Sequence, residues 1–380
     1  MQLSRHPFLF LPSIAFLIAS HSLAADKAPP KKIASAAPKP TELIWPLPPD
    51  PPRVRWVTEY SDLAKIGKTA KKASWIEKVS GAKTPDEKQE LRRPYGVATD
   101  SHGRIFVADS ERKVVFVIDR DGKALERREG TGRAPLVMPV GVAIDAQDRL
   151  FVSDAATHSI TYFDAAGEPV AQFGSAQLGR PGGIAIDRNR SRLYVADAKE
   201  SRIAVFDINT LKFVRFIGSA SKPGKREPGT FANPSNIAVD RRGDLYIADT
   251  FNQRIQILDA EGKFIKSIGT QGDAPGEFIR PKGIAVDSEG HIYVADAEFN
   301  NFQILTREGQ PLLAVGALGT NPGQFALVAG LFIDSNDQIY TTEQYHGRVQ
   351  VFQYIPQPVP TNSKADPKAD GKEANSSNRH

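Results

Sequence analysis

The strongest constraint on the fold is a segment that returns six times along the chain. Its first copy, residues 93–109, runs from a Pro-x-Gly opening at Pro94 to an aspartate at Asp109. Later copies open at Pro139, Pro181, Pro234, Pro281 and, in decayed form, Val328. The glycines of successive copies are 45, 42, 53, 47 and 47 residues apart, with Asn236 in the glycine position of the fourth copy. A period of this length, built from short alternating stretches, is typical of a β-propeller.

Each copy predicts four short antiparallel strands, which make one blade. In the fourth copy we expect strands at 236–239, 245–248, 254–258 and 264–268, separated by turns that contain Gly243 and Gly262. The inner stretches are almost entirely small or apolar, as in strands that are buried on both faces, whereas the outer stretches alternate.

The pattern resembles the NHL repeat family, whose units carry Pro-x-Gly-Ile-Ala-Val-Asp, Tyr-Val-Ala-Asp and Arg-Ile-Gln-Val-Phe stretches. The fourth copy matches nearly throughout, including 254–258 (RIQIL). The resemblance covers about residues 91–355 and implies an all-β, six-bladed β-propeller. The chain departs from the family pattern at Ser159 and Asn301, where the third-strand arginine is missing, and at Val328 and Glu343 in the sixth copy.

The sixth copy ends after its third strand, at residues 348–354. A three-stranded last blade would leave an open sheet edge. Residues 53–60 (RVRWVTEY) alternate as a strand does, so we predict that they supply the outermost strand of the sixth blade and close the ring. The propeller would then span residues 53–355.

A helical insert is predicted between this closing strand and the first blade, at residues 61–92. Thr84, Pro85 and Glu87 form a capping box that opens a short helix. Basic residues outnumber acidic ones in the insert, and Trp75 lies on one helical face with Ile76 and Val79. The insert is either a strap over the ring or a docking element that uses Lys71, Lys72, Trp75 and Lys78.

The segments outside the repeats predict export. Residues 1–24 have the apolar run and small-residue end of a signal peptide, and the run is shorter than the roughly 20 residues that cross a bilayer. A Pro/Ala/Lys-rich linker is expected at 25–52 and a disordered tail at 356–380. The chain has no cysteine, so there is neither a disulfide framework nor a thiolate metal site. We therefore expect a periplasmic or secreted protein without a stable membrane anchor.

The acids that recur in every copy are interpreted as structural. Each second-strand acid and each inner-strand aspartate is expected to accept backbone N–H groups in a turn. The second-strand set comprises Asp109, Asp154, Asp197, Asp249, Asp296 and Glu343. The inner-strand set comprises Asp100, Asp145, Asp187, Asp240, Asp287 and Asp334.

Residues that differ from copy to copy are the better candidates for a site, because a ligand breaks the symmetry of the ring. The position between proline and glycine, at the expected channel mouth, reads Tyr95, Val140, Gly182, Ser235, Lys282 and Ala329. Peptide-amidating lyases of similar fold carry zinc-binding histidines at several such positions; none is histidine here, so that activity is not expected. The histidines within the copies are expected to be solvated turn residues: His102, His158, His291 and His346.

The leading hypothesis is a non-catalytic scaffold, monomeric, that binds a protein partner and needs no cofactor or metal. Its candidate contacts are the basic insert together with Tyr95, Ser235, Asn236, Lys282, Lys225 and Arg226. Residues 53–226 hold 31 basic and 22 acidic side chains and residues 227–354 hold 9 and 16, a field that could orient an acidic partner. The nearly balanced total and the predicted export disfavour nucleic acid.

Two alternatives stay open. One is a channel-site hydrolase, lactonase or lyase that uses a divalent cation, as the related gluconolactonase-like propellers imply, with Asn236 as the one inner-strand amide. The other is binding of a glycan or peptidoglycan fragment by aromatic residues around one mouth, namely Tyr95, Phe251, Phe299 and Tyr345.

Overall fold

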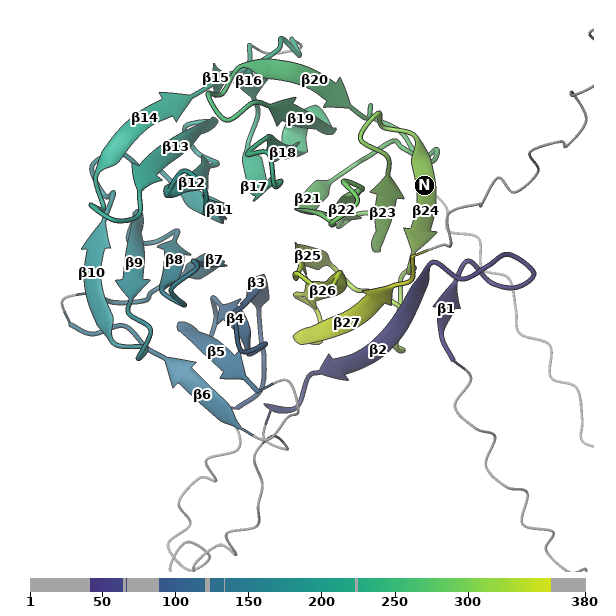
Figure 1. The fold of residues 1–380 in the computed structure, drawn as a ribbon, viewed down its shortest axis with the longest axis horizontal. Helices are drawn as coiled ribbons and strands as arrows, with labels where there is room; N and C mark the ends of the chain where they lie inside the picture. The colour runs from purple at the N-terminus through teal and green to yellow at the C-terminus, as the bar shows by residue number, and fades with distance from the viewer. Residues whose placement is uncertain are drawn as a thin grey trace, which may run out of the picture. The chain divides into compact units, whose positions relative to one another are not determined.

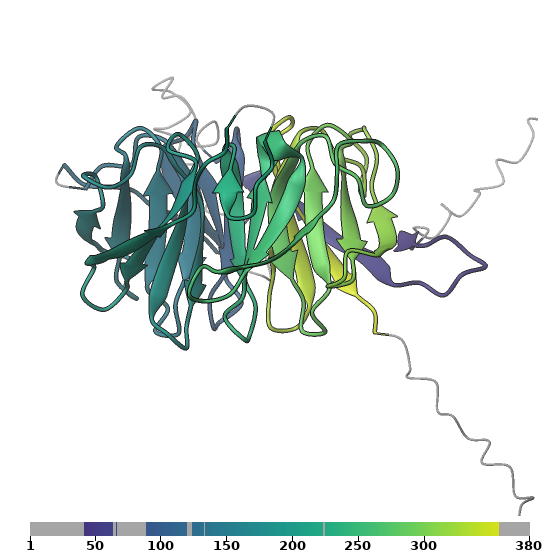
Figure 2. The ribbon, with the colours of Figure 1, turned by 90° about the horizontal axis from the view of Figure 1, so that it is seen from above.

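The computed structural model describes residues 42–63, 66, 89–119, 124–132, 134–222 and 225–356. These residues form six blades around a central axis, with their innermost strands nearest the centre (Figure 1). Seen from the edge, the blades stand side by side around the ring (Figure 2). The predicted all-β, six-bladed propeller is therefore confirmed.

Several predicted segments lie outside the described residues. They are the signal peptide, the linker up to residue 41, the tail from residue 357, and most of the helical insert, including Lys71, Lys72, Trp75 and Lys78. Within the described part of the chain, no helix has the length and apolar character needed to cross a membrane.

Each of the first five blades is a four-stranded antiparallel sheet, numbered from the axis outward. Blade 1 comprises β3 (Pro94–Thr99), β4 (Ile105–Asp109), β5 (Val114–Ile118) and β6 (Leu125–Arg128). Blade 2 comprises β7 (Pro139–Ile144), β8 (Leu150–Asp154), β9 (Ser159–Phe163) and β10 (Pro169–Phe173). Blade 3 comprises β11 (Pro181–Asp187), β12 (Arg192–Asp197), β13 (Arg202–Asp207) and β14 (Phe213–Ile217).

The remaining strands follow the same plan. Blade 4 comprises β17 (Pro234–Val239), β18 (Leu245–Asp249), β19 (Arg254–Leu258) and β20 (Phe264–Ile268), with a 3₁₀ turn, η3, at Thr250–Asn252. Blade 5 comprises β21 (Pro281–Val286), β22 (Ile292–Asp296), β23 (Asn301–Leu305) and β24 (Pro311–Val315). Blade 6 comprises β25 (Val328–Ile333), β26 (Gln338–Glu343) and β27 (Arg348–Tyr354). Between blades 3 and 4, β15 (Ser219–Ala220) pairs in parallel with β16 (Thr230–Phe231).

The core lies between neighbouring blades. One cluster joins Phe106 and Val115 of blade 1 to Val142, Ile144 and other residues of blade 2. Each blade has a neighbour on both sides, so side chains on both faces of its central strands are buried, as the apolar inner stretches predict.

The repeated glycine of the inner strands reflects the close approach of blades at the axis. A Cβ atom on Gly330 of β25 would lie 1.8 Å from the backbone oxygen of Tyr95 in β3. In blade 4 this position is Asn236, whose side chain packs against Gly183 of blade 3: a Cβ atom on Gly183 would lie 1.9 Å from the Asn236 Oδ1 atom.

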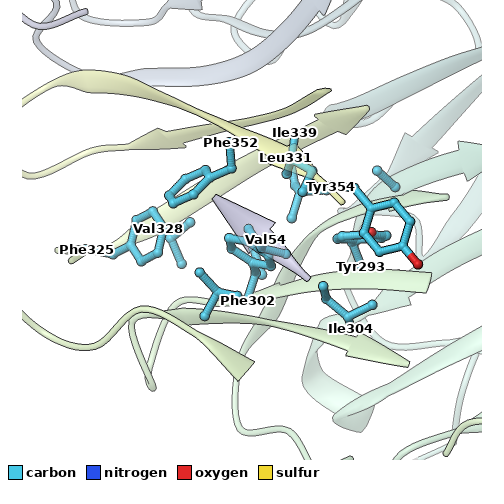
Figure 3. Packing of buried hydrophobic residues seen from close by; sticks show 13 residues of the cluster. Val54, Tyr293, Phe302, Ile304, Phe325, Val328, Leu331, Ile339, Phe352 and Tyr354 are labelled. Atoms are coloured by element: carbon cyan, nitrogen blue, oxygen red, sulfur yellow. The ribbon is translucent and has the colours of Figure 1, made fainter. Parts of the chain in front are cut away.

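The predicted closing strand is confirmed. β2 (Val54–Tyr60) pairs antiparallel with β27 and becomes the fourth strand of blade 6 (Figure 1). Val54 is fully buried in a hydrophobic cluster that joins blades 5 and 6. Phe302 and Phe352 belong to the same cluster (Figure 3). A further strand, β1 (Ile44–Trp45), pairs with β2. These two residues lie within the segment 25–52 that is expected to be a linker, so the linker is shorter than predicted.

The recurring acids act as turn acceptors, as expected. Asp109 is fully buried, and its carboxylate accepts N–H groups of Arg92 and Arg93 before blade 1 and of Glu111 and Arg112 after β4. The inner-strand Asp100 likewise accepts the N–H groups of His102 and Arg104. These hydrogen bonds fasten each loop to its own blade, which explains the repetition without any ligand.

Candidate binding face

The ring has two faces of different character. We call the "loop face" the side where the inner strands begin, marked by Arg93, Met138, Arg180, Asn233, Arg280 and Leu327 immediately before them. The second strands of the blades end on the same side. We call the "turn face" the side where the inner strands end, marked by the six inner-strand aspartates. The loop face carries the residues that vary most between blades.

A central cavity of about 760 Å³ runs along the axis. Its wall is made by the small and aliphatic residues of the inner strands, from Tyr95 at one end to the ring of aspartates at the turn face. Tyr95 starts in blade 1, yet the centre of its ring lies 5.8 Å from the Lys282 Nζ atom of blade 5, and Ser235 of blade 4 influences the pKa of its hydroxyl. The Tyr95 side chain therefore extends toward blades 4 and 5 at the loop-face end of the cavity.

Three predicted site residues come together at this mouth. The Ser235 hydroxyl accepts a hydrogen bond from Thr250 at 2.8 Å and donates one to the Lys282 carbonyl at 3.1 Å. The Lys282 Nζ atom lies 5.8 Å from the centre of the Tyr95 ring, within the range of a cation–π contact. Burial raises the pKa of Tyr95 to about 12. Burial, together with the neighbouring Arg280, lowers the pKa of Lys282.

The other predicted contacts are placed differently. Asn236 is 8 % exposed, and its Oδ1 atom accepts the N–H of Ile237 at 2.9 Å, so this oxygen already has a donor. Lys225 and Arg226 are exposed on the loop between blades 3 and 4, where Arg226 donates to the Gln253 carbonyl. Within the described part of the chain, no hydrogen bond or ring contact joins either of them to the Tyr95 cluster.

Large exposed apolar residues form the second feature of the loop face. Phe251 and Tyr345 are each 62 % exposed after the second strands of blades 4 and 6, and both were named from the sequence as candidate aromatics. Tyr95 is half-buried, as is Phe299. Met138 and Leu327, 40 % and 43 % exposed, were not predicted. The sequence does contain a feature that could have identified them. The residue immediately before the inner strand is arginine in three copies but methionine, asparagine or leucine in the others.

The turn face brings one possible set of metal ligands together. Among the described residues, one group of metal-ligating side chains has its ligand atoms close enough together to share an ion. It consists of Asp100, His102 and Asp148. The Asp100 carboxylate, however, already accepts from two backbone N–H groups and the Arg104 Nε, and Asp148 accepts from the backbone and hydroxyl of Ser101. Because these carboxylate oxygens already accept hydrogen bonds, the group is better explained as a hydrogen-bonded turn than as a cation site.

The histidines are not equivalent. His158 and His346 are exposed, and 72 % of the His102 side chain is exposed, as expected of turn residues. His291 is half-buried, and its Nδ1 atom lies 2.9 Å from the Asp287 carboxylate. The hydrogen bond to Asp287 raises the pKa of His291 against the opposing effect of burial.

Replacing His291 with glutamine is expected to destabilise the protein more at pH 5.5 than at pH 8.5. A histidine whose folded-state pKa is raised stabilises the fold below its unfolded pKa, and this contribution is lost as the pH rises through the folded value. The difference in melting temperature between wild type and variant, measured across this range, should therefore shrink with increasing pH. His158→Gln is the control, and a pH-independent difference for His291→Gln would contradict the assignment.

Comparison with known proteins supports the architecture. A family model described as a 6-bladed beta-propeller matches residues 226–303. NHL repeat-containing protein 2 of Bos taurus is 27 % identical over 186 residues, which cover 47 % of this chain and 22 % of that protein. Protein brain tumor of Drosophila melanogaster is 48 % identical over 44 residues, 12 % of this chain and 4 % of that protein. The chain thus spans at most about a fifth of the length of these curated relatives.

Solved structures of similar fold include two lyases. A streptogramin B lyase structure gives a TM-score of 0.53 at 12 % identity, covering 70 % of this chain and 94 % of that one. A catalytically inactive virginiamycin B lyase from Staphylococcus aureus, solved with quinupristin, gives 0.51 at 16 % identity, covering 69 % and 95 %. At such low identity the likeness establishes the fold alone.

Proposed function

We propose that this chain, which is a six-bladed β-propeller of the NHL type, is an exported scaffold that binds a protein partner through its loop face. The observation that carries the proposal is the combination of exposed apolar side chains with arginines on that face. Phe251, Tyr345, Met138 and Leu327 belong to blades 2, 4 and 6, whereas Arg93, Arg180 and Arg280 belong to blades 1, 3 and 5. Aromatic residues, methionine and arginine are the residue types enriched at protein interfaces.

The environment of the arginines supports the same conclusion. In the part of the chain that the structure describes, no carboxylate lies within ion-pair distance of Arg93 or Arg180, and Arg280 reaches Glu298 only at 3.9 Å. On the turn face, by contrast, Arg104 and Arg190 are bound to inner-strand aspartates. The exposed side chains of Arg93, Arg180 and Arg280 are thus available to a partner. Export to the periplasm or beyond is proposed from the signal-like residues 1–24 alone.

Site-specific photo-crosslinking in the native host tests the face. A benzoylphenylalanine in place of Phe251 or Tyr345 is expected to give adducts of the same mass with one protein, identified by mass spectrometry. Leu312 on the outer strand β24 is 51 % exposed and is the matched control position, from which no such adduct is expected. Equal labelling from position 312, or no adduct from either loop-face position, would count against the proposal.

A further inference from the structure

Positive charge gathers at the centre of the loop face, where the one described ion pair is a 3.9 Å contact between Arg280 and Glu298. Lys282 is half-buried beside the Tyr95 ring, and Arg280 is close enough to lower its pKa. Arg180 is close enough to Tyr95 to influence the ionisation of its hydroxyl. Across the described ranges, no carboxylate comes within 4 Å of the Lys282 ammonium. The half-buried Lys282 ammonium has thus lost part of its hydration without gaining an ion pair, which costs free energy.

The turn face of the same fold pairs its charges differently. There the inner-strand aspartates of blades 1, 3 and 5 each hold a basic side chain: Arg104 on Asp100, Arg190 on Asp187, and His291 on Asp287. On the loop-face side the second-strand acids are occupied by backbone N–H groups and, in blades 4 and 6, by the arginines of their own third strands, Arg254 and Arg348. Among the described residues, no second-strand acid therefore pairs with Lys282 or Arg180 at the mouth.

We propose that this mouth binds a carboxylate presented by an acidic segment of the protein partner. The inference rests on the proposed function and adds the chemistry by which the partner is recognised. The carboxylate forms a charge-assisted pair with the Lys282 ammonium, with Arg180 and Arg280 alongside. The carboxylate binds at the mouth and not within the cavity, because the cavity wall includes Tyr95 but not Lys282.

The surroundings favour a peptide over a nucleic acid. The mouth is flanked by exposed Met138, Leu327 and Phe251, which suit a segment with both acidic and apolar residues. Residues 53–354 carry nearly equal numbers of basic and acidic side chains, unlike the basic surface that a polyphosphate chain requires.

Fluorescence polarisation with labelled peptides tests the site directly. The probe is a fluorescein-labelled hexapeptide of alternating glutamate and leucine, and its counterpart carries glutamine in place of glutamate. The acidic peptide is expected to bind, and Lys282→Met to weaken it at least about tenfold, since a hydrogen bond to a charged group contributes at least that much. Lys266→Met is the matched control, because Lys266 lies on the outer strand β20. Amidating the C-terminus of the probe shows whether the carboxylate comes from a side chain or a chain end.

The pH dependence provides an independent readout. A bound carboxylate favours the charged form of Lys282, so affinity should fall as the pH rises through the lowered pKa of the free protein, and the fall should be absent in Lys282→Met. Equal binding of both peptides, unchanged affinity in Lys282→Met, or preferential binding of an RNA hexanucleotide would overturn the site. Loop-face crosslinks that persist in Lys282→Met would leave the scaffold function standing while this site fails.

Discussion

Replacing Val54 with aspartate is expected to lower the melting temperature by about 10 °C or more. Val54 is fully buried between blades 5 and 6, where Phe302 and Phe352 belong to the same cluster (Figure 3). An unpaired carboxylate in that position costs several kcal/mol. One kcal/mol corresponds to roughly 2–4 °C in a domain of this size. Differential scanning calorimetry measures the effect.

The closing strand also provides its own control. Val57 lies on the same strand, β2, but is 41 % exposed, so Val57→Asp should change the melting temperature by less than about 2 °C. A large effect of both substitutions would mean that an added aspartate destabilises β2 wherever it is placed, so burial of Val54 would not be the cause. An unchanged transition in Val54→Asp would show that closure by this strand does not limit the stability of the ring.

The closing strand illustrates what could be predicted from sequence. Its alternation at 53–60 and the missing fourth strand of the sixth copy were sufficient to predict the pairing with β27. The two-residue strand β1 was not predictable, because Ile44 and Trp45 are flanked by proline-rich sequence without strand periodicity. Its formation depends on tertiary contacts, including an edge-on contact between Trp45 and Phe352 with ring centres 5.8 Å apart.

The candidate site was predictable only in part. Tyr95, Ser235 and Lys282 were identified because their position differs between otherwise similar copies. That Tyr95 of blade 1 approaches Lys282 of blade 5 depends on the radius of the closed ring, which no local pattern encodes. Met138 and Leu327 were missed for a related reason, since an apolar residue beside a buried strand is usually buried and only the assembled ring leaves these two exposed.

Replacing Arg348 with methionine is expected to destabilise the protein by about 3–5 kcal/mol, because it would leave buried acceptors without their donor. The Arg348 side chain is 4 % exposed and pairs with Glu343, which is 1 % exposed. It also donates to Glu59 of the closing strand at 2.8 Å and to backbone carbonyls of residues 320, 321 and 324 in the loop before blade 6. One side chain thus joins the last blade, its entry loop and the strand that closes the ring.

A comparison within the chain separates this role from a general effect of losing a charge. Arg242 pairs with Asp240 and Asp244 but is 61 % exposed, so Arg242→Met should cost less than about 1 kcal/mol. The pair with Glu59 is isolated by a double-mutant cycle in which Glu59→Gln is made alone and together with Arg348→Met, with stability measured by urea denaturation. We expect a coupling energy of at least about 0.5 kcal/mol, since the two residues are in direct contact. Additive effects would show that Arg348 stabilises its own blade and loop but contributes nothing to closure, which would then depend on Val54 and the β2–β27 pairing alone.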